Sequence, residues 1–251
     1  MKRIFAILLA LALLMPPSPA QDKPLADSTT ENLPEWLVKF SNLPRKDREQ
    51  YLQAFNNAKT AYQNGQWVIC ISYLADCELI FRHNPNVWNL RACCLMEQKY
   101  FEEAERELLR LREAVPDDPV TIMNLANLHL ASGRYQECID TISALREKLP
   151  EDTPGDLIYV LDFRHFLSLV MMGKREESKK LLKGLTPMSD TPLYYYGQIV
   201  YAMVDGNQAE VSRNLRIVNN IFAKSTAIVP YQRAMELSGI ANKRPNTPAG
   251  K

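Results

Sequence analysis

The feature that most constrains this chain is a register of residue types that repeats every 34 residues. Aromatic residues recur at that interval as Trp67, Phe101 and Tyr135. The small or apolar residues that follow keep the same register through three copies: Cys70, Ala104 and Cys138; Leu74, Leu108 and Ile142; Cys77, Leu111 and Leu145. Because a fixed period of roughly 20 to 50 residues is typical of stacked repeats, we predict an array of similar units rather than one closed core.

Each copy also carries the pattern of two helices joined by a tight turn. Gly65, Lys99 and Gly133 share the 34-residue register, and Gly173 and Gly206 extend it after steps of 40 and 33 residues. A glycine takes the left-handed backbone conformation that ends a helix, because it has no Cβ atom to clash. Four of the nine glycines stand at this one position. We therefore predict a helical hairpin in each copy, with its turn at these residues.

Two of the copies share a further set of positions. The second copy has Trp88, Ala92, Leu95, Ala104, Leu108 and Pro116, and the third has Ile122, Leu125, Ala126, His129, Cys138, Ile142 and Pro150. This pattern resembles the tetratricopeptide repeat (TPR), whose signature is W-x2-L-G-x2-Y, then A-x3-F, then P. Arg91 stands where the signature has leucine. The resemblance covers roughly residues 48–222. It implies an all-α fold, an α-solenoid of about five TPR-like helical hairpins with terminal capping helices.

The resemblance, together with the sequence on either side of the repeats, predicts four segments. Residues 1–20 are expected to be a signal peptide and residues 21–47 a mobile segment followed by a short N-terminal helix from Pro34. Residues 48–242 are expected to form the TPR-like α-solenoid, and residues 243–251 a disordered tail. The last helix, near the end of the solenoid, is expected to cover the open end of the array, since a stack of repeats exposes apolar surface there.

The first 20 residues have the three parts of a secretory signal. Lys2 and Arg3 precede an unbroken apolar run over residues 4–15, and Ser18 and Ala20 are the small residues of a cleavage site. The run is too short to span a bilayer, so we expect cleavage after Ala20 and no membrane span in the mature chain. An uncleaved N-terminal anchor is the alternative. The prediction is a periplasmic or secreted protein.

The five cysteines, an odd number, lie in segments predicted as helix: Cys70, Cys77, Cys93, Cys94 and Cys138. We expect them to be small buried packing residues. Cys70 and Cys77 are two turns apart on one helix, about 10 Å, which is beyond the reach of a disulfide. Two alternatives stay open: a Cys77–Cys94 bridge between neighbouring helices, and the adjacent Cys93 and Cys94 as a redox pair.

Charge and motif content argue against several classes of function. Lys and Arg total 30 against 29 Asp and Glu, so no basic excess is available to neutralise a nucleic-acid backbone. His83, His129 and His165 lack the spacing of paired metal ligands, and the sequence has no phosphate loop or nucleophile elbow. We therefore predict no nucleic-acid partner, no metal, no cofactor and no enzyme activity.

The TPR resemblance implies that the first helix of each unit lines a concave face that binds a segment of another protein. The residues at these inward positions are mostly apolar: Phe55, Tyr62, Met96, Met123, Asn127, Leu130, Phe163, Leu167, Met171, Tyr196 and Met203. Methionine and aromatic side chains suit the apolar face of a partner helix. We predict an exported scaffold that binds a protein or peptide partner through this apolar groove, as an envelope assembly or adaptor factor.

Other interpretations of the same residues stay open. The chain's own segments, such as the residues near Trp36 or the last helix, would bury the groove, and a homo-oligomer would fill it with a second copy. The second case makes the protein a self-associating structural subunit. An envelope enzyme or glycan-binding module is a further alternative. The charge clamp that some relatives use for a C-terminal carboxylate is incomplete here: Asn124 and Asn127 match two positions, and only Lys59 joins them.

Overall fold

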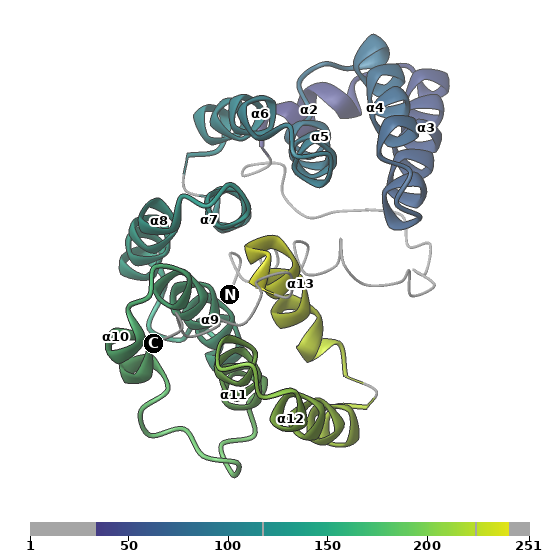
Figure 1. Cartoon of the computed structure of the whole chain (residues 1–251). Coiled ribbons are helices and arrows are strands. Elements are labelled where there is room, and N and C mark those ends of the chain that lie inside the picture. Colours follow the sequence, from purple (N-terminus) through teal and green to yellow (C-terminus); the bar gives the residue numbers. More distant parts are fainter. Residues whose placement is uncertain (1–33, 117, 224, 241–251) are drawn as a thin grey trace. The chain divides into compact units, whose positions relative to one another are not determined.

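The computed structural model describes residues 34–116, 118–223 and 225–240 (Figure 1). Every regular element in these residues is helical, with twelve α-helices and one short 3-10 helix. The all-α fold class is therefore confirmed. The expected signal peptide, the part of the expected mobile segment before residue 34 and the expected C-terminal tail lie outside the described residues. Among the helices of the described ranges, none is both long enough and apolar enough to cross a membrane.

The described residues divide into two compact units, with the boundary between residues 121 and 122. The described part of unit 1 contains α2 (Glu35–Ser41), α3 (Arg45–Gln63), α4 (Trp67–Ile80), α5 (Pro85–Glu97), α6 (Phe101–Ala114) and the start of α7 (Pro119–Ala131). Each helix from α3 to α5 packs on the next one along the chain. Unit 1 is thus a run of consecutive helical hairpins, as an α-solenoid requires.

Unit 2 contains the rest of α7 and the helices that follow it. These are α8 (Tyr135–Lys148), α9 (Gly155–Met171), α10 (Arg175–Leu181), α11 (Pro192–Val204), α12 (Gln208–Ile221), the 3-10 helix η2 (Thr226–Ile228) and α13 (Val229–Ser238). Helix α9 packs on α8, α10 and α11, and α11 packs on α12. The hairpin pattern therefore continues through α12, with a shortened second helix at α10.

The predicted turn closes all five hairpins. Its central residue has a positive φ at Gly65 (71°), Gly133 (77°), Gly173 (77°) and Gly206 (72°), and at Lys99 (62°). The next amide in each case donates to the carbonyl five residues earlier, which is the bond that ends a helix in this geometry. These bonds run from Gln66 to Ala61, Tyr100 to Leu95, Arg134 to His129, Lys174 to Leu169 and Asn207 to Ala202, at 2.8–2.9 Å.

Three of the first helices begin in the same way, with a polar cap followed by proline. The side chain of Asn84 accepts a hydrogen bond from the Asn86 amide at 2.9 Å, ahead of α5. Asp118 accepts from the Thr121 amide at 2.9 Å, ahead of α7, and Thr191 caps α11. Each proline costs little at this position because the first helical amide has no partner in the helix. The sequence therefore fixes both ends of these helices.

The short helix α2 closes the N-terminal side of unit 1. Pro34 stands directly before its first residue. The ring of Phe40 packs edge-on against Tyr51, with centroids 4.9 Å apart, and against Phe81, at 5.6 Å. This contact ties α2 to α3 and to the end of α4.

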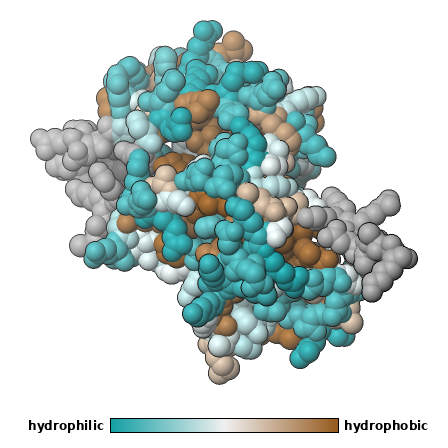
Figure 2. Space-filling model, turned by 60° about the vertical axis from the view of Figure 1, so that its left-hand side comes forward, coloured by the Kyte–Doolittle hydropathy of each residue, from teal (hydrophilic) through white to brown (hydrophobic). Residues whose placement is uncertain are grey.

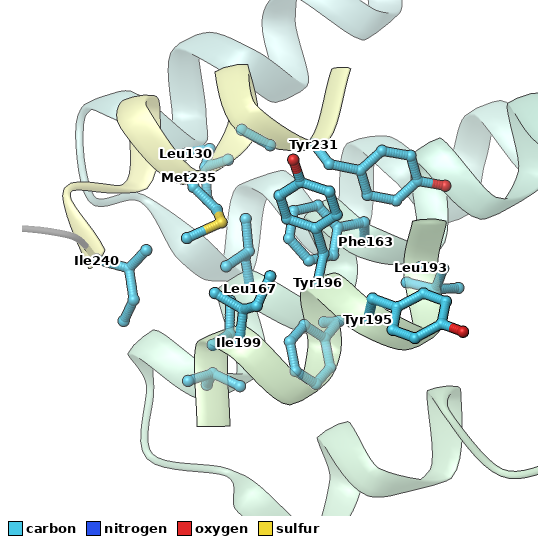
Figure 3. Packing of buried hydrophobic residues seen from close by; sticks show 14 of the residues in the cluster. Leu130, Phe163, Leu167, Leu193, Tyr195, Tyr196, Ile199, Tyr231, Met235 and Ile240 are labelled. Atoms are coloured by element: carbon cyan, nitrogen blue, oxygen red, sulfur yellow. The ribbon is translucent and has the colours of Figure 1, made fainter. Parts of the chain in front are cut away.

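The last helix, α13, is placed differently from the prediction. It was expected to cover the open end of the array, which would put it against the last hairpin. It packs mainly on α9 instead (Figure 1). Its residues Tyr231, Ala234 and Met235 belong to the hydrophobic core of unit 2 (Figure 3). Helix α13 is thus part of the core rather than a cover on the end of the array.

Candidate binding surfaces

The structure separates the predicted groove residues into two groups. Five of them are buried: Met96, Leu130, Phe163, Leu167 and Tyr196. The other six are partly buried: Phe55, Tyr62, Met123, Asn127, Met171 and Met203. No open apolar groove therefore runs through all of these positions.

The buried positions on α9 and α11 are covered by α13. The ring of Tyr231 lies 5.0 Å from that of Phe163 and 5.3 Å from that of Tyr196, measured between centroids (Figure 3). Phe163 and Tyr196 also touch each other edge-on at 5.8 Å. The expectation that these two residues line an open groove is corrected by this packing. The last helix fills that surface, which is one of the alternatives the sequence left open.

One charged residue, Arg164 on α9, lies inside this packing and is 4% exposed. Its Nε donates to Asn127 Oδ1 at 2.7 Å and its Nη1 donates to the Val160 carbonyl at 3.0 Å. No carboxylate of the described residues pairs with it, and burial lowers its pKa to about 10. The amide of Asn127 therefore serves an internal contact. Sequence analysis missed Arg164, although an arginine among apolar residues of a predicted first helix was a visible signal.

The predicted groove positions in unit 1 are engaged by their neighbours. Phe55 stacks on Tyr51 with ring centroids 6.3 Å apart, and Lys59 Nζ lies 5.5 Å from the Phe55 ring centroid. Tyr62 packs on Trp67 at 5.1 Å. These side chains stay half-buried, so they give α3 a limited apolar surface rather than a deep groove.

Helix α4 has a markedly apolar exposed face. Val68 is 71% exposed, Ile69 47% and Leu79 79%. Ser72, Ala75 and Asp76 complete the exposed side of this helix. The opposite side is buried through Cys70, Leu74 and Cys77. On the view in Figure 2, apolar areas interrupt a mostly hydrophilic surface. Because exposed large apolar residues that share one face indicate an interaction site, this face is a candidate binding surface.

Helices α6 and α8 occupy the same place in their hairpins as α4, but their exposed faces are mostly polar. The same six positions of the repeat are exposed in all three helices. In α6 they are Glu102, Glu103, Arg106, Leu109, Arg110 and Glu113, and in α8 they are Gln136, Glu137, Asp140, Ser143, Ala144 and Glu147. Where α4 has Val68, Ile69 and Leu79, the other two helices have glutamate or glutamine. We call the six α4 residues the α4 face.

The charged residues beside the α4 face are used inside unit 1. Glu78 forms an ion pair with Arg91 at 2.6 Å, and Arg91 also reaches Glu107 at 3.3 Å. Arg110 lies over the Trp88 ring, 4.0 Å from its centroid. This network gives the half-buried Arg91 two carboxylate partners within unit 1. It also leaves Asp76 as the single charged residue of the α4 face.

The described residues hold no group of three side chains suited to bind a metal ion. His83 packs edge-on against Phe81 with centroids 6.0 Å apart. Burial lowers the pKa of His165, which lies half-buried on α9.

All five cysteines are free thiols, and four are buried. Cys77 Sγ donates to the Tyr51 carbonyl at 3.8 Å, so it contacts α3. The thiol that hydrogen-bonds to Cys94 is Cys70. The Cys77–Cys94 pair considered from the sequence is therefore not the pair that the structure brings together.

No family model matches the chain, and no curated protein does.

Proposed function

We propose that this protein is an exported, TPR-type scaffold that binds a protein partner through the α4 face. The observation that supports the proposal most is the exposure of Val68 and Leu79, at positions where α6 and α8 have charged or polar residues. A helix that faced only water would gain nothing from these side chains. A partner that covers them gains about 1–2 kcal/mol for each, because burial removes apolar surface from water.

The shape of the α4 face suits a helical segment of the partner. Val68, Ser72, Ala75 and Leu79 follow one another at spacings of four, three and four residues. These spacings place them in one stripe along the helix, with small residues in its centre. A partner helix with apolar residues at the same spacing would pack closely against the small centre and cover the large ends. The partner proposed is thus a protein with an amphipathic helix.

The proposed partner binds on α4 rather than along the predicted groove, because α13 covers Phe163 on α9 and Tyr196 on α11. Export to the periplasm or the extracellular space stays part of the proposal and rests on residues 1–20. The work of such a scaffold is assembly or adaptor function in the cell envelope.

The test is site-specific photocrosslinking in the native cell. A photoreactive amino acid replaces Ser72, in the middle of the α4 face, and in a matched control it replaces Arg106, at the same repeat position of α6. We expect one protein to be crosslinked at position 72 and not at position 106. Adding Val68→Glu and Leu79→Glu to the first variant should abolish that product. Equal products at both positions, or a product that survives the two glutamates, would contradict the proposal.

A second candidate function, a self-associating structural subunit, is favoured by the symmetry of the same stripe. Read in either direction, the stripe runs large, small, small, large: Val68, Ser72, Ala75, Leu79. A two-fold axis through its centre would pair Val68 with Leu79 of a second copy, as an isologous interface requires. Sedimentation velocity of the purified chain separates the candidates. A dimer that Leu79→Glu converts to a monomer supports self-association, and a monomer at all concentrations argues for a foreign partner.

A further inference from the structure

Two buried thiols of unit 1 lie in contact across neighbouring helices. Cys70 is on α4 and Cys94 is on α5, and both are 0% exposed. Helices α4 and α5 pack on each other and are joined by only a short connection, so they run antiparallel. Near the start of α4 and the end of α5, the two thiols hydrogen-bond to one another.

The register of the hairpin singles out this pair. Cys77 lies two helical turns further along α4 than Cys70, about 10 Å along the axis, so it is out of reach of Cys94. Cys93 is adjacent to Cys94 on α5, where the helical backbone points their side chains in different directions. Cys138 belongs to unit 2 and is buried in the core of that unit. Among the five cysteines, Cys70 and Cys94 are the two whose side chains meet between helices.

We propose that Cys70 and Cys94 form a disulfide that links α4 to α5 when the chain folds in an oxidising compartment. The two thiols lose two protons and two electrons and form one S–S bond. The electrons pass to a disulfide oxidant, either an oxidised thiol oxidoreductase or glutathione disulfide, whose own S–S bond is reduced to two thiols. Because both thiols are buried in the finished unit, the exchange takes place as α4 and α5 come together, before unit 1 closes around them.

The exchange proceeds in two steps. The thiolate of one of the two cysteines attacks the oxidant and forms a mixed disulfide with it, and the thiol of the other then resolves that mixed disulfide and releases the second sulfur of the oxidant as a thiol. The bridge encloses the α4–α5 connection and constrains the unfolded chain, so it stabilises unit 1.

The test is thiol counting on the full chain. The protein is refolded with glutathione disulfide, denatured without reductant and alkylated, and the labelled thiols are counted by intact mass and located by peptide mapping. All five cysteines are free in the reduced chain. The proposal requires that two of them, Cys70 and Cys94, become protected, and that Cys77, Cys93 and Cys138 stay labelled. Reduction of the bridged protein should lower its melting temperature by roughly 5–10 °C.

Matched variants separate the pair from its alternatives. Cys70→Ser and Cys94→Ser should each leave every remaining thiol labelled, whereas Cys138→Ser should still form the bridge. Labelling of all five thiols in the refolded wild-type chain would overturn the proposal, as would a mapped Cys77–Cys94 or Cys93–Cys94 link. Since the oxidising compartment rests on the proposed export, the free thiols of the protein isolated from its native cell are counted as well. A chain that bridges in vitro and is reduced in the cell supports the pair and refutes export.

Discussion

Tyr231 on the last helix and Phe163 on α9 hold their ring centroids 5.0 Å apart, at a tilt of 50°. The contact joins residues 68 positions apart in the sequence, and Tyr231 is 2% exposed. It shows that α13 completes the core of unit 2. The surface of α9 and α11 that the sequence predicts as part of an open groove is thus occupied by the chain's own C-terminal helix.

Replacing Tyr231 should therefore destabilise unit 2 strongly. We expect Tyr231→Ala to lower the free energy of unfolding by about 3 kcal/mol, because it removes the contacts with Phe163 and Tyr196 and leaves a cavity. Urea denaturation followed by far-UV circular dichroism measures the change. Met188→Ala is the control, since Met188 is 90% exposed, and it should change stability by less than about 0.5 kcal/mol. Equal stability of the two variants would show that α13 is not a core element.

Substitutions at two equivalent turn positions should change the free energy of unfolding in opposite directions. Lys99 has φ 62° at the position where Gly133 has φ 77°. A left-handed conformation destabilises a residue that has a Cβ atom by about 1–2 kcal/mol, and glycine avoids this cost. Part of the benefit is lost because glycine has more conformational freedom in the unfolded chain. We expect Lys99→Gly to raise the free energy of unfolding by about 0.5 kcal/mol and Gly133→Ala to lower it by about 1 kcal/mol. Two shifts of the same sign in melting temperature would refute the turn assignment.

Arg164 should cost stability near neutral pH. Its pKa falls from 12.5 to about 10 in the folded chain because burial disfavours the charged form. Between these two values the unfolded chain binds more protons than the folded chain, so stability should rise as pH rises through about 10. Below that range the penalty is present in full.

A neutral side chain of similar length should remove this penalty. We expect Arg164→Met to keep the free energy of unfolding at neutral pH or to raise it by up to about 2 kcal/mol. The rise in the free energy of unfolding through about pH 10 should be absent in this variant. Arg164→Ala is the matched comparison, and it should be less stable than Arg164→Met because it leaves a cavity. A large loss of stability in Arg164→Met would show that the hydrogen bond to Asn127 outweighs the cost of burial.

Gly197 lets α11 pack closely against the end of α10. A Cβ atom added at Gly197 would lie 2.5 Å from Leu182 Cδ1, so the leucine side chain would have to shift. We expect Gly197→Ala to lower the free energy of unfolding by about 1 kcal/mol. In a Leu182→Ala background the same substitution should cost nothing, because the clashing atoms are gone. An equal cost in both backgrounds, measured by urea denaturation, would contradict this account.

Much of the fold could be predicted from local signals. The 34-residue register and the turn position at Gly65 and Gly133 specify the hairpins, because a helix end needs a left-handed residue wherever its partners are. The same register placed Lys99 correctly, although lysine alone gives no such signal. Local patterns act within a hairpin, and there they were sufficient.

The candidate site could be predicted only in part. The apolar character of Phe163 and Tyr196 follows from the sequence, but what covers them depends on α13, which lies outside the repeats. The α4 face needed the exposure of each position before Val68 and Leu79 could be distinguished from core residues. Once the exposed positions are known, comparison with Glu102 and Glu113 at the 34-residue interval identifies them. The apolar character of residues on a helix does not by itself indicate whether their face is buried in the core or exposed for binding.

The most direct test of the account is calorimetric titration of the crosslinked partner into two forms of the protein. One is the wild-type chain, and the other carries Val68→Glu, Ile69→Glu and Leu79→Glu, which place at these three positions the glutamate that α6 has there. The account predicts that the triple variant keeps its helical content and melting temperature and loses at least 100-fold in affinity, since about 3 kcal/mol or more of apolar burial is removed. Unchanged affinity in a folded triple variant would contradict it.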